Sequence, residues 1–280
     1  HVSIGTALRL VSVAAESLAA AFLLGAEGIV AATAAIAVGV TLEAVYSAVA
    51  ARPVVTGPLR AAQPVTPPLT LPGFMRFFLP LVLTSLLSLV VQPIGSAAMA
   101  RMPMALESLA VWPVASGLLF ILRSLGFALN EVVVALLDRP GAYRALRRFS
   151  LLLSGALLSV TALVAFTPLA TFWFADLSGL PPALTALATL GLAWALPWPV
   201  LDVVRNLVQG VAVHTRRTGV ISWSMVVFLG VTGAALAVGV ALQRFPALPV
   251  AMVAFVAATA AQVAWLWWSV RAERARLAAA

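Results

Sequence analysis

The chain has 280 residues, of which 63% are hydrophobic and only 9% are charged. A soluble domain averages about 25% charged residues, so the composition excludes a soluble protein and predicts a polytopic membrane protein. The chain has no cysteine, which excludes disulfides and thiolate chemistry. The net charge of +8 comes from arginines that lie mostly between apolar segments, so it indicates membrane topology and not nucleic-acid binding.

The apolar residues form eight segments, each long enough to cross a bilayer as a helix, for which about 20 residues suffice. We therefore predict an all-α fold with about eight transmembrane helices. The fourth and sixth segments exceed this minimum, so we expect them to be tilted, kinked or extended beyond the bilayer. The segments cover residues 5–24, 28–50, 74–100, 107–137, 149–172, 183–211, 219–242 and 248–270.

Arginine placement predicts the orientation of these helices. If the first segment starts in the cytoplasm, only Arg101 and Arg244 fall on the outer side, while Arg123 and Arg205 lie within apolar segments. This bias predicts a multi-pass protein of the cell's inner (cytoplasmic) membrane, with both ends of this chain in the cytoplasm. The cytoplasmic arginines are Arg9, Arg52, Arg60, Arg76, Arg139, Arg144, Arg147, Arg148, Arg216, Arg217, Arg271, Arg274 and Arg276.

Residues 53–73 form a long proline-rich connection, which we expect to have no regular helix. We interpret it as an extended cytoplasmic linker, with a loop of no further consequence as the alternative. The segments that end at Arg52 and Arg274 resemble each other at an offset of 222 residues, which predicts an internal repeat. Residues 1–52 would then be the last two helices of a truncated first bundle, and 74–276 a six-helix bundle. The prolines are Pro53, Pro58, Pro64, Pro67, Pro68 and Pro72.

The fourth apolar segment carries a polar face. Trp112, Ser116, Arg123 and Asn130 are spaced four, seven and seven residues apart, which places them on one side of a helix. A charge at bilayer depth costs about 3 kcal/mol or more, and such groups usually face a bundle interior or water. No acidic residue lies three or four positions from Arg123, and Glu131 is about 12 Å away along the axis. Arg123 therefore needs a partner on another helix or a bound anion, unless this face only joins helices.

The third segment combines a polar stripe with prolines. Gln92 continues a series of every fourth residue from Thr84 and Ser88. We expect Pro80 and Pro93 to bend this helix. Interrupted helices at membrane depth often hold solute and ion sites.

The sixth segment has the same combination. Pro197 and Pro199 flank Trp198, and Asp202 and Arg205 follow at a spacing of three, which lets them pair within one helix. A self-neutralising bridge and a solute site are both consistent with that pair. The candidate site residues are Arg123 and Arg205 for anion contact, Gln92 and Asn130 for lining a cavity, and Glu131 and Asp202 for coupling to H⁺ or Na⁺.

No metal site, catalytic residue or resident cofactor is predicted. His1 and His214 lie outside the apolar segments, which excludes a histidine-rich metal site. The chain has neither an HExxH motif nor the clustered aspartates that hold magnesium, so we do not expect an enzyme. The basic stretch Asp138–Phe149 and the basic tail set topology, or attract anionic lipid.

Several longer motifs together resemble a known superfamily. These are FFLPL at 77–81, GAYRALRRFSLLLSG at 141–155 and LPWPVLDVVRNLVQGVAVHTRRTG at 196–219. The chain resembles the C-terminal two-thirds of the multidrug and toxic-compound extrusion superfamily, which includes polysaccharide and lipid flippases. QPIGSAAMARM at 92–102, WPVASG at 112–117 and NEVVVALLD at 130–138 narrow the resemblance to the progressive-ankylosis type, over about residues 74–140.

The resemblance implies two six-helix bundles around a central cavity and export by alternating access, of anions such as nucleotide, pyrophosphate or citrate in the ankylosis branch. On this resemblance, we expect the chain to hold only the last two helices of the first bundle. The expected function is secondary active export of a polar, anionic solute by a monomer in the bilayer. A lipid or lipid-linked saccharide flippase, an integral membrane enzyme and a purely structural eight-helix protein are the alternatives.

Overall fold

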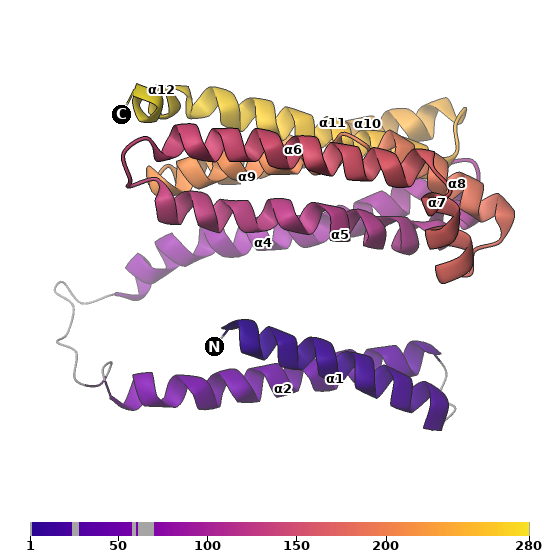
Figure 1. The fold of residues 1–280 in the computed structure, drawn as a ribbon, viewed down its shortest axis with the longest axis horizontal. Coiled ribbons are helices and arrows are strands. Elements are labelled where there is room, and N and C mark those ends of the chain that lie inside the picture. The colour runs from indigo at the N-terminus through magenta and orange to yellow at the C-terminus, as the bar shows by residue number, and fades with distance from the viewer. Residues whose placement is uncertain (1, 24–27, 58–59, 61–69, 280) are drawn as a thin grey trace. The chain divides into compact units, whose positions relative to one another are not determined.

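A computed structural model describes residues 2–23, 28–57, 60 and 70–279, and within these ranges the chain is helical without a strand. Helices satisfy every backbone polar group internally, which a segment surrounded by hydrocarbon requires. The chain divides into two compact units, residues 1–73 and 74–280 (Figure 1). The assignment of these units to the end of one bundle and the whole of another stays a prediction.

The first unit is a pair of helices, α1 (Val2–Leu23) and α2 (Gly28–Thr56). They pack closely at Gly39, where an added Cβ would lie 2.5 Å from Cγ2 of Val13. An ion pair of 3.0 Å joins Arg9 of α1 to Glu43 of α2. Small residues and paired charges are the usual means of association between apolar helices.

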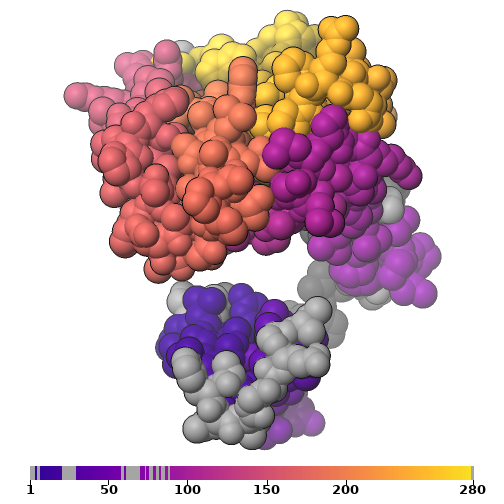
Figure 2. Space-filling model, turned by 90° about the vertical axis from the view of Figure 1, so that its right-hand side faces the viewer, coloured from indigo at the N-terminus to yellow at the C-terminus, as the bar shows by residue number. Residues whose placement is uncertain are grey.

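The second unit surrounds α9, which packs against α5, α6 and α11 (Figure 1). Gly210 of α9 permits close approach to α5, because a Cβ there would come within 2.6 Å of Cγ1 of Val133. Figure 2 shows α4 in violet at the margin of this unit. The elements are α4 (Leu71–Met99), α5 (Ala105–Leu136), α6 (Ala142–Phe166), α7 (Leu169–Thr171), the π-helix η1 (Phe172–Leu177), α8 (Pro182–Trp194), α9 (Trp198–His214), α10 (Thr218–Leu242), α11 (Ala247–Ser269) and α12 (Arg271–Ala279).

Six stretches of helix among the described residues are long and apolar enough to cross a membrane. The chain is therefore an all-helical, multi-pass membrane protein. α1, with 22 residues, and α4, with 29, coincide with the first and third predicted segments, but the count of eight spans stays a prediction. The six are Val30–Thr56, Ala105–Leu136, Ala142–Phe166, Pro182–His214, Thr218–Leu242 and Ala247–Ser269.

The prediction that residues 53–73 have no regular helix is wrong at both ends. α2 continues through Pro53 to Thr56. The proline ring removes one backbone hydrogen bond of the helix. The carbonyl of Pro53 still accepts a hydrogen bond from Gly57 N–H at 3.1 Å, which closes the last turn. α4 already begins at Leu71, so Pro72 lies in a first turn that needs no N–H donor. Pro58, Pro64, Pro67 and Pro68 lie outside the described residues.

The prolines of the other segments differ in effect. α4 remains one helix past both Pro80 and Pro93. The sixth segment, by contrast, is divided by a turn at residues 195–197, so Trp198 opens α9. The fifth segment starts earlier than expected, because α6 already begins at Ala142 and includes most of the predicted basic loop.

One end of the second unit is rich in arginine, and we call it the arginine-rich end. It contains the α5–α6 turn, the α9–α10 turn and α12 (Figure 1). Arg217 forms an ion pair of 2.7 Å with Glu273 there, and Arg144 Nε donates to the carbonyl of Ala278 at 2.9 Å. Arg101 lies at the opposite end, where its carbonyl accepts from Gln243. Arginines are thus segregated within this unit, and which end faces the cytoplasm stays a prediction.

Candidate functional site

The embedded Arg123 of α5 has a partner on another helix, as the sequence requires. Its Nε donates to Oδ2 of Asp202 on α9, a residue 79 positions further along the chain. The Asp202 side chain is fully buried, whereas the Arg123 side chain keeps 17% of its surface exposed. Each residue lies inside a stretch that is long and apolar enough to cross a membrane, so the pair joins two such helices.

Asp202 also contacts a second guanidinium. Arg205 Nη2 lies 3.0 Å from Oδ1 of the same carboxylate, which confirms the predicted pairing at a spacing of three. Asn206 Nδ2 donates to the backbone carbonyl of Asp202 at 2.8 Å and fixes this turn of α9. Two guanidinium groups thus share one carboxylate, and the cluster carries a net charge of +1.

An aromatic stack supports the cluster. The guanidinium carbon of Arg123 lies 4.0 Å from the ring centroid of Trp198. Trp198 stacks on Phe255 of α11 at 5.4 Å and 9°, and Phe255 in turn stacks on Trp112 of α5 at 5.5 Å. A cation over an aromatic face is worth about 0.5–2 kcal/mol, more when it is desolvated. The stack therefore fixes the plane of the guanidinium.

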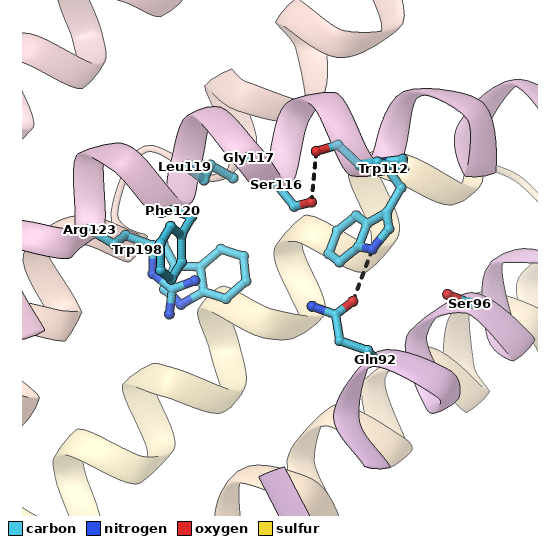
Figure 3. A pocket seen from close by; sticks show the side chains of 10 residues that line it. Gln92, Ser96, Trp112, Ser116, Gly117, Leu119, Phe120, Arg123 and Trp198 are labelled. Atoms are coloured by element: carbon cyan, nitrogen blue, oxygen red, sulfur yellow. Dashed lines mark hydrogen bonds between the residues drawn. The ribbon is translucent and has the colours of Figure 1, made fainter. Parts of the chain in front are cut away.

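A hydrogen bond connects the stack to α4. The indole N–H of Trp112 donates to Oε1 of Gln92 at 3.0 Å (Figure 3). Gly95, one turn on, lets α4 approach Phe255, because a Cβ there would lie 3.1 Å from its Cζ. Gln92 is thus placed at the site from a third helix.

A pocket of about 550 Å³ opens beside these residues. Figure 3 shows Gln92, Trp112 and Ser116 on one side of it, and Arg123, Phe120 and Trp198 on the other. Solute and cofactor sites in proteins are typically clefts of about 300–1,000 Å³ with a few placed polar groups. The lining residues are Gln92, Ser96, Trp112, Pro113, Ser116, Gly117, Leu119, Phe120, Arg123 and Trp198.

The terminal nitrogens of Arg123 distinguish this group from a sealed structural arginine. Only Nε bonds to Asp202, and the described residues offer Nη1 and Nη2 no hydrogen-bond acceptor. The Arg123 side chain also belongs to the pocket lining. A guanidinium with both terminal NH₂ groups free presents the geometry that binds carboxylate or phosphate by two parallel hydrogen bonds.

The other candidate residues lie outside this pocket. Arg205 contacts Oδ1 of Asp202 and does not line the cavity. Asn130 is half-buried on α5 with its Oδ1 unpaired, and Glu131 is exposed on the next position. The structure thus brings together Gln92, Arg123 and, behind it, Asp202.

The sequence placed Trp112 on the polar face of its segment, but sequence reasoning missed Trp198 and Phe255 as members of the site. The prolines around Trp198 were a visible signal, since they begin a helix at that residue. Phe255 gave no such signal, because it lies in a uniformly apolar run, and Ser96 gave none because it lies in an alanine-rich turn. Comparison of the chain with family models, with curated proteins and with solved structures finds no match.

Proposed function

We propose that this chain forms part of a secondary active transporter that exports a polar, anionic solute by alternating access. One observation carries the proposal: Arg123, within a membrane-spanning helix, is held by Asp202 through Nε alone and faces a pocket of about 550 Å³ with its other nitrogens free. Charged groups inside a membrane protein mark solute or ion pathways, or pair with one another. Arg123 does both.

The positive charge of the cluster favours an anion. Asp202 neutralises only one of its two arginines, so an anionic group in the pocket would meet a net positive wall. Trp112 and Trp198 add flat apolar surface beside the charge, and Gln92 and Ser116 add hydrogen-bonding groups. This set suits a small organic or phosphorylated anion with both polar and planar parts.

Coupling to an ion gradient is assigned to Asp202. Its carboxylate is the acidic group bonded to Arg123, whereas Glu131 is exposed and remote from the pocket. Binding of H⁺ or Na⁺ at Asp202 would weaken its hold on Arg123 and change the affinity of the pocket for an anion. The Gln92–Trp112 hydrogen bond, which joins α4 to α5, is a contact that alternating access would break and remake.

A flippase for lipid or a lipid-linked saccharide is the second candidate. Phe120 lines the same pocket yet is 60% exposed, so an apolar group stands at its rim. A lipid chain could lie against such a rim while its headgroup contacted Arg123. The two candidates predict different cargo at the same residues.

The full chain, reconstituted in liposomes, tests the proposal through flux of labelled citrate and pyrophosphate. We expect saturable flux that falls about 10- to 100-fold in Arg123→Gln, since a hydrogen bond to a charged group is worth about 1.5–3 kcal/mol. Arg244→Gln, at an exposed position of the α10–α11 turn, is the matched control and should leave flux unchanged. Equal flux in both variants would remove Arg123 from the mechanism, and flipping of a lipid-linked saccharide without anion flux would favour the second candidate.

A further inference from the structure

A second polar pocket lies at the arginine-rich end, and it shares no lining residue with the pocket beside Arg123. It has a volume of about 240 Å³ and is lined by Tyr143, Arg144, Arg147, Arg148, Leu151 and Ala278. Five of these residues come from the first three turns of α6, and the last comes from α12. Three arginines therefore face one small cavity.

These arginines lack acidic partners among the described residues. Arg144 is held by the backbone carbonyl of Ala278, while Arg147 and Arg148 are exposed and have no ion pair. Two acidic residues lie at the same end of the unit. Glu273 pairs with Arg217 at 2.7 Å, and Asp138 is exposed to solvent and lies 3.7 Å from His214, so neither forms an ion pair with these arginines. Within the part of the chain that the structure describes, the three positive charges of this pocket thus have no acidic partner.

The position of the arginines also opposes helix stability. They occupy the first two turns of α6, which has no acidic residue in its first turn. The N-terminal end of a helix carries a partial positive charge that acts mainly within the first turn, so the cation of Arg144 there costs about 0.3–1 kcal/mol. An anion at this place would relieve both the mutual repulsion and the unfavourable helix end.

The wall of the pocket continues into exposed apolar surface. Leu151 lines it and is 62% exposed, and Leu152 and Phe149 beside it are 66% and 52% exposed. α6 is one of the helices apolar enough to cross a membrane, so these side chains lie where acyl chains would contact it. Charge at the mouth and hydrocarbon below match the two parts of a phospholipid.

We propose that this pocket binds the phosphate headgroup of an anionic phospholipid, with its acyl chains along Leu151 and Leu152. Arg147 and Arg148 would hold the phosphate oxygens, and Arg144, oriented by α12, would complete the site. Basic pockets of this kind recognise anionic headgroups through charge-assisted hydrogen bonds. The site is independent of the solute pocket and of the transport proposal.

The test is native mass spectrometry of the full chain released from detergent with added phosphatidylglycerol, phosphatidylcholine or inorganic phosphate. The expected result is retention of phosphatidylglycerol at least about tenfold above phosphatidylcholine, with loss of that preference in Arg147→Gln/Arg148→Gln. Arg216→Gln/Arg276→Gln, which removes two exposed arginines at the same end, should retain it.

Three results would overturn the proposal: equal retention of both lipids, full retention in the Arg147/Arg148 double variant, or binding of inorganic phosphate as tight as that of phosphatidylglycerol. If the double glutamine variant does not fold, Arg147→Lys/Arg148→Lys takes its place. It keeps the charge but loses bidentate geometry, and a weaker preference for the anionic lipid is then expected.

Discussion

Replacing Asp202 with asparagine should tighten anion binding in the pocket while it weakens the fold. The substitution keeps the shape of the side chain but removes the one negative charge shared by Arg123 and Arg205. The cluster then changes from a net charge of +1 to +2. If Asp202 lies beside a bound solute, anion affinity should rise while stability falls. If Asp202 has only a structural role, stability should fall without a rise in anion affinity.

The size of the effect follows from the geometry. An anion bonded to the terminal nitrogens of Arg123 would lie about 6 Å from the Asp202 carboxylate, on the far side of one guanidinium. Two unit charges at that distance repel by about 3 kcal/mol at an effective dielectric constant of about 20. Removal of this repulsion corresponds to an affinity increase on the order of 100-fold.

Equilibrium binding of labelled citrate or pyrophosphate to the purified chain measures this increase. Thermal unfolding of the same sample should show a lower midpoint, because breaking a buried ion pair costs about 3–5 kcal/mol. Asp138→Asn removes an exposed carboxylate at the end of α5 and should change neither quantity. A folded Asp202→Asn protein with unchanged or weaker anion affinity would refute the reasoning.

Three further predictions concern the stability of the second unit. Trp198→Ala should destabilise it by about 3–5 kcal/mol in chemical unfolding, because it empties a buried site between Arg123 and Phe255, whereas Trp198→Phe should lose less. Gly210→Ala should cost about 1–3 kcal/mol of stability, because the added Cβ collides with α5. Gly155→Ala is the control: its Cβ meets nothing within 4 Å, so it should be neutral or stabilising. Equal shifts of the melting temperature in the two variants would contradict this packing. A hydrogen bond from its own backbone N–H, and then its contacts with Arg217, lower the pKa of Glu273 below its ordinary value of 4.5, although burial opposes this. Glu273 therefore stabilises the docking of α12 above that value and loses this effect as pH falls through its lower folded pKa. The protection of α12 amides against hydrogen exchange, measured relative to the intrinsic exchange rate at each pH, should fall on acidification in the native chain and depend less on pH in Glu273→Gln.

The helices could be predicted from the sequence because length and hydrophobicity dominate in a membrane. The predicted segment 107–137 and the helix Ala105–Leu136 differ by two residues or fewer at each end. The start of α6 at Ala142 was missed because its first turns carry Arg144, Arg147 and Arg148, which read as a loop by hydropathy. Arginine is a good helix former, so these turns extend the helix beyond the apolar stretch.

The candidate site was predictable only in part. The Asp202–Arg205 pair depends on local spacing, and the need of Arg123 for a remote partner depends on the cost of burying charge. The sequence could not identify Asp202 as that partner, because it lies 79 positions further along the chain and the packing of the helices decides which of their faces are in contact. The stack of Trp112, Phe255 and Trp198 depends on the same tertiary packing.

The most direct measurement is water access to the pocket and its closure by an anion. The chain has no cysteine, so Ser116→Cys on the pocket wall gives a single reactive thiol, and Leu125→Cys on the opposite face of α5, 60% exposed there, is the matched control. A membrane-impermeant maleimide should label Ser116→Cys in liposomes and should leave Leu125→Cys unlabelled. Labelling of Ser116→Cys should be slower when citrate or pyrophosphate is present than when neither is. A Ser116→Cys thiol as inert as the control, or labelled at a rate that no anion changes, would contradict an anion pathway at Arg123.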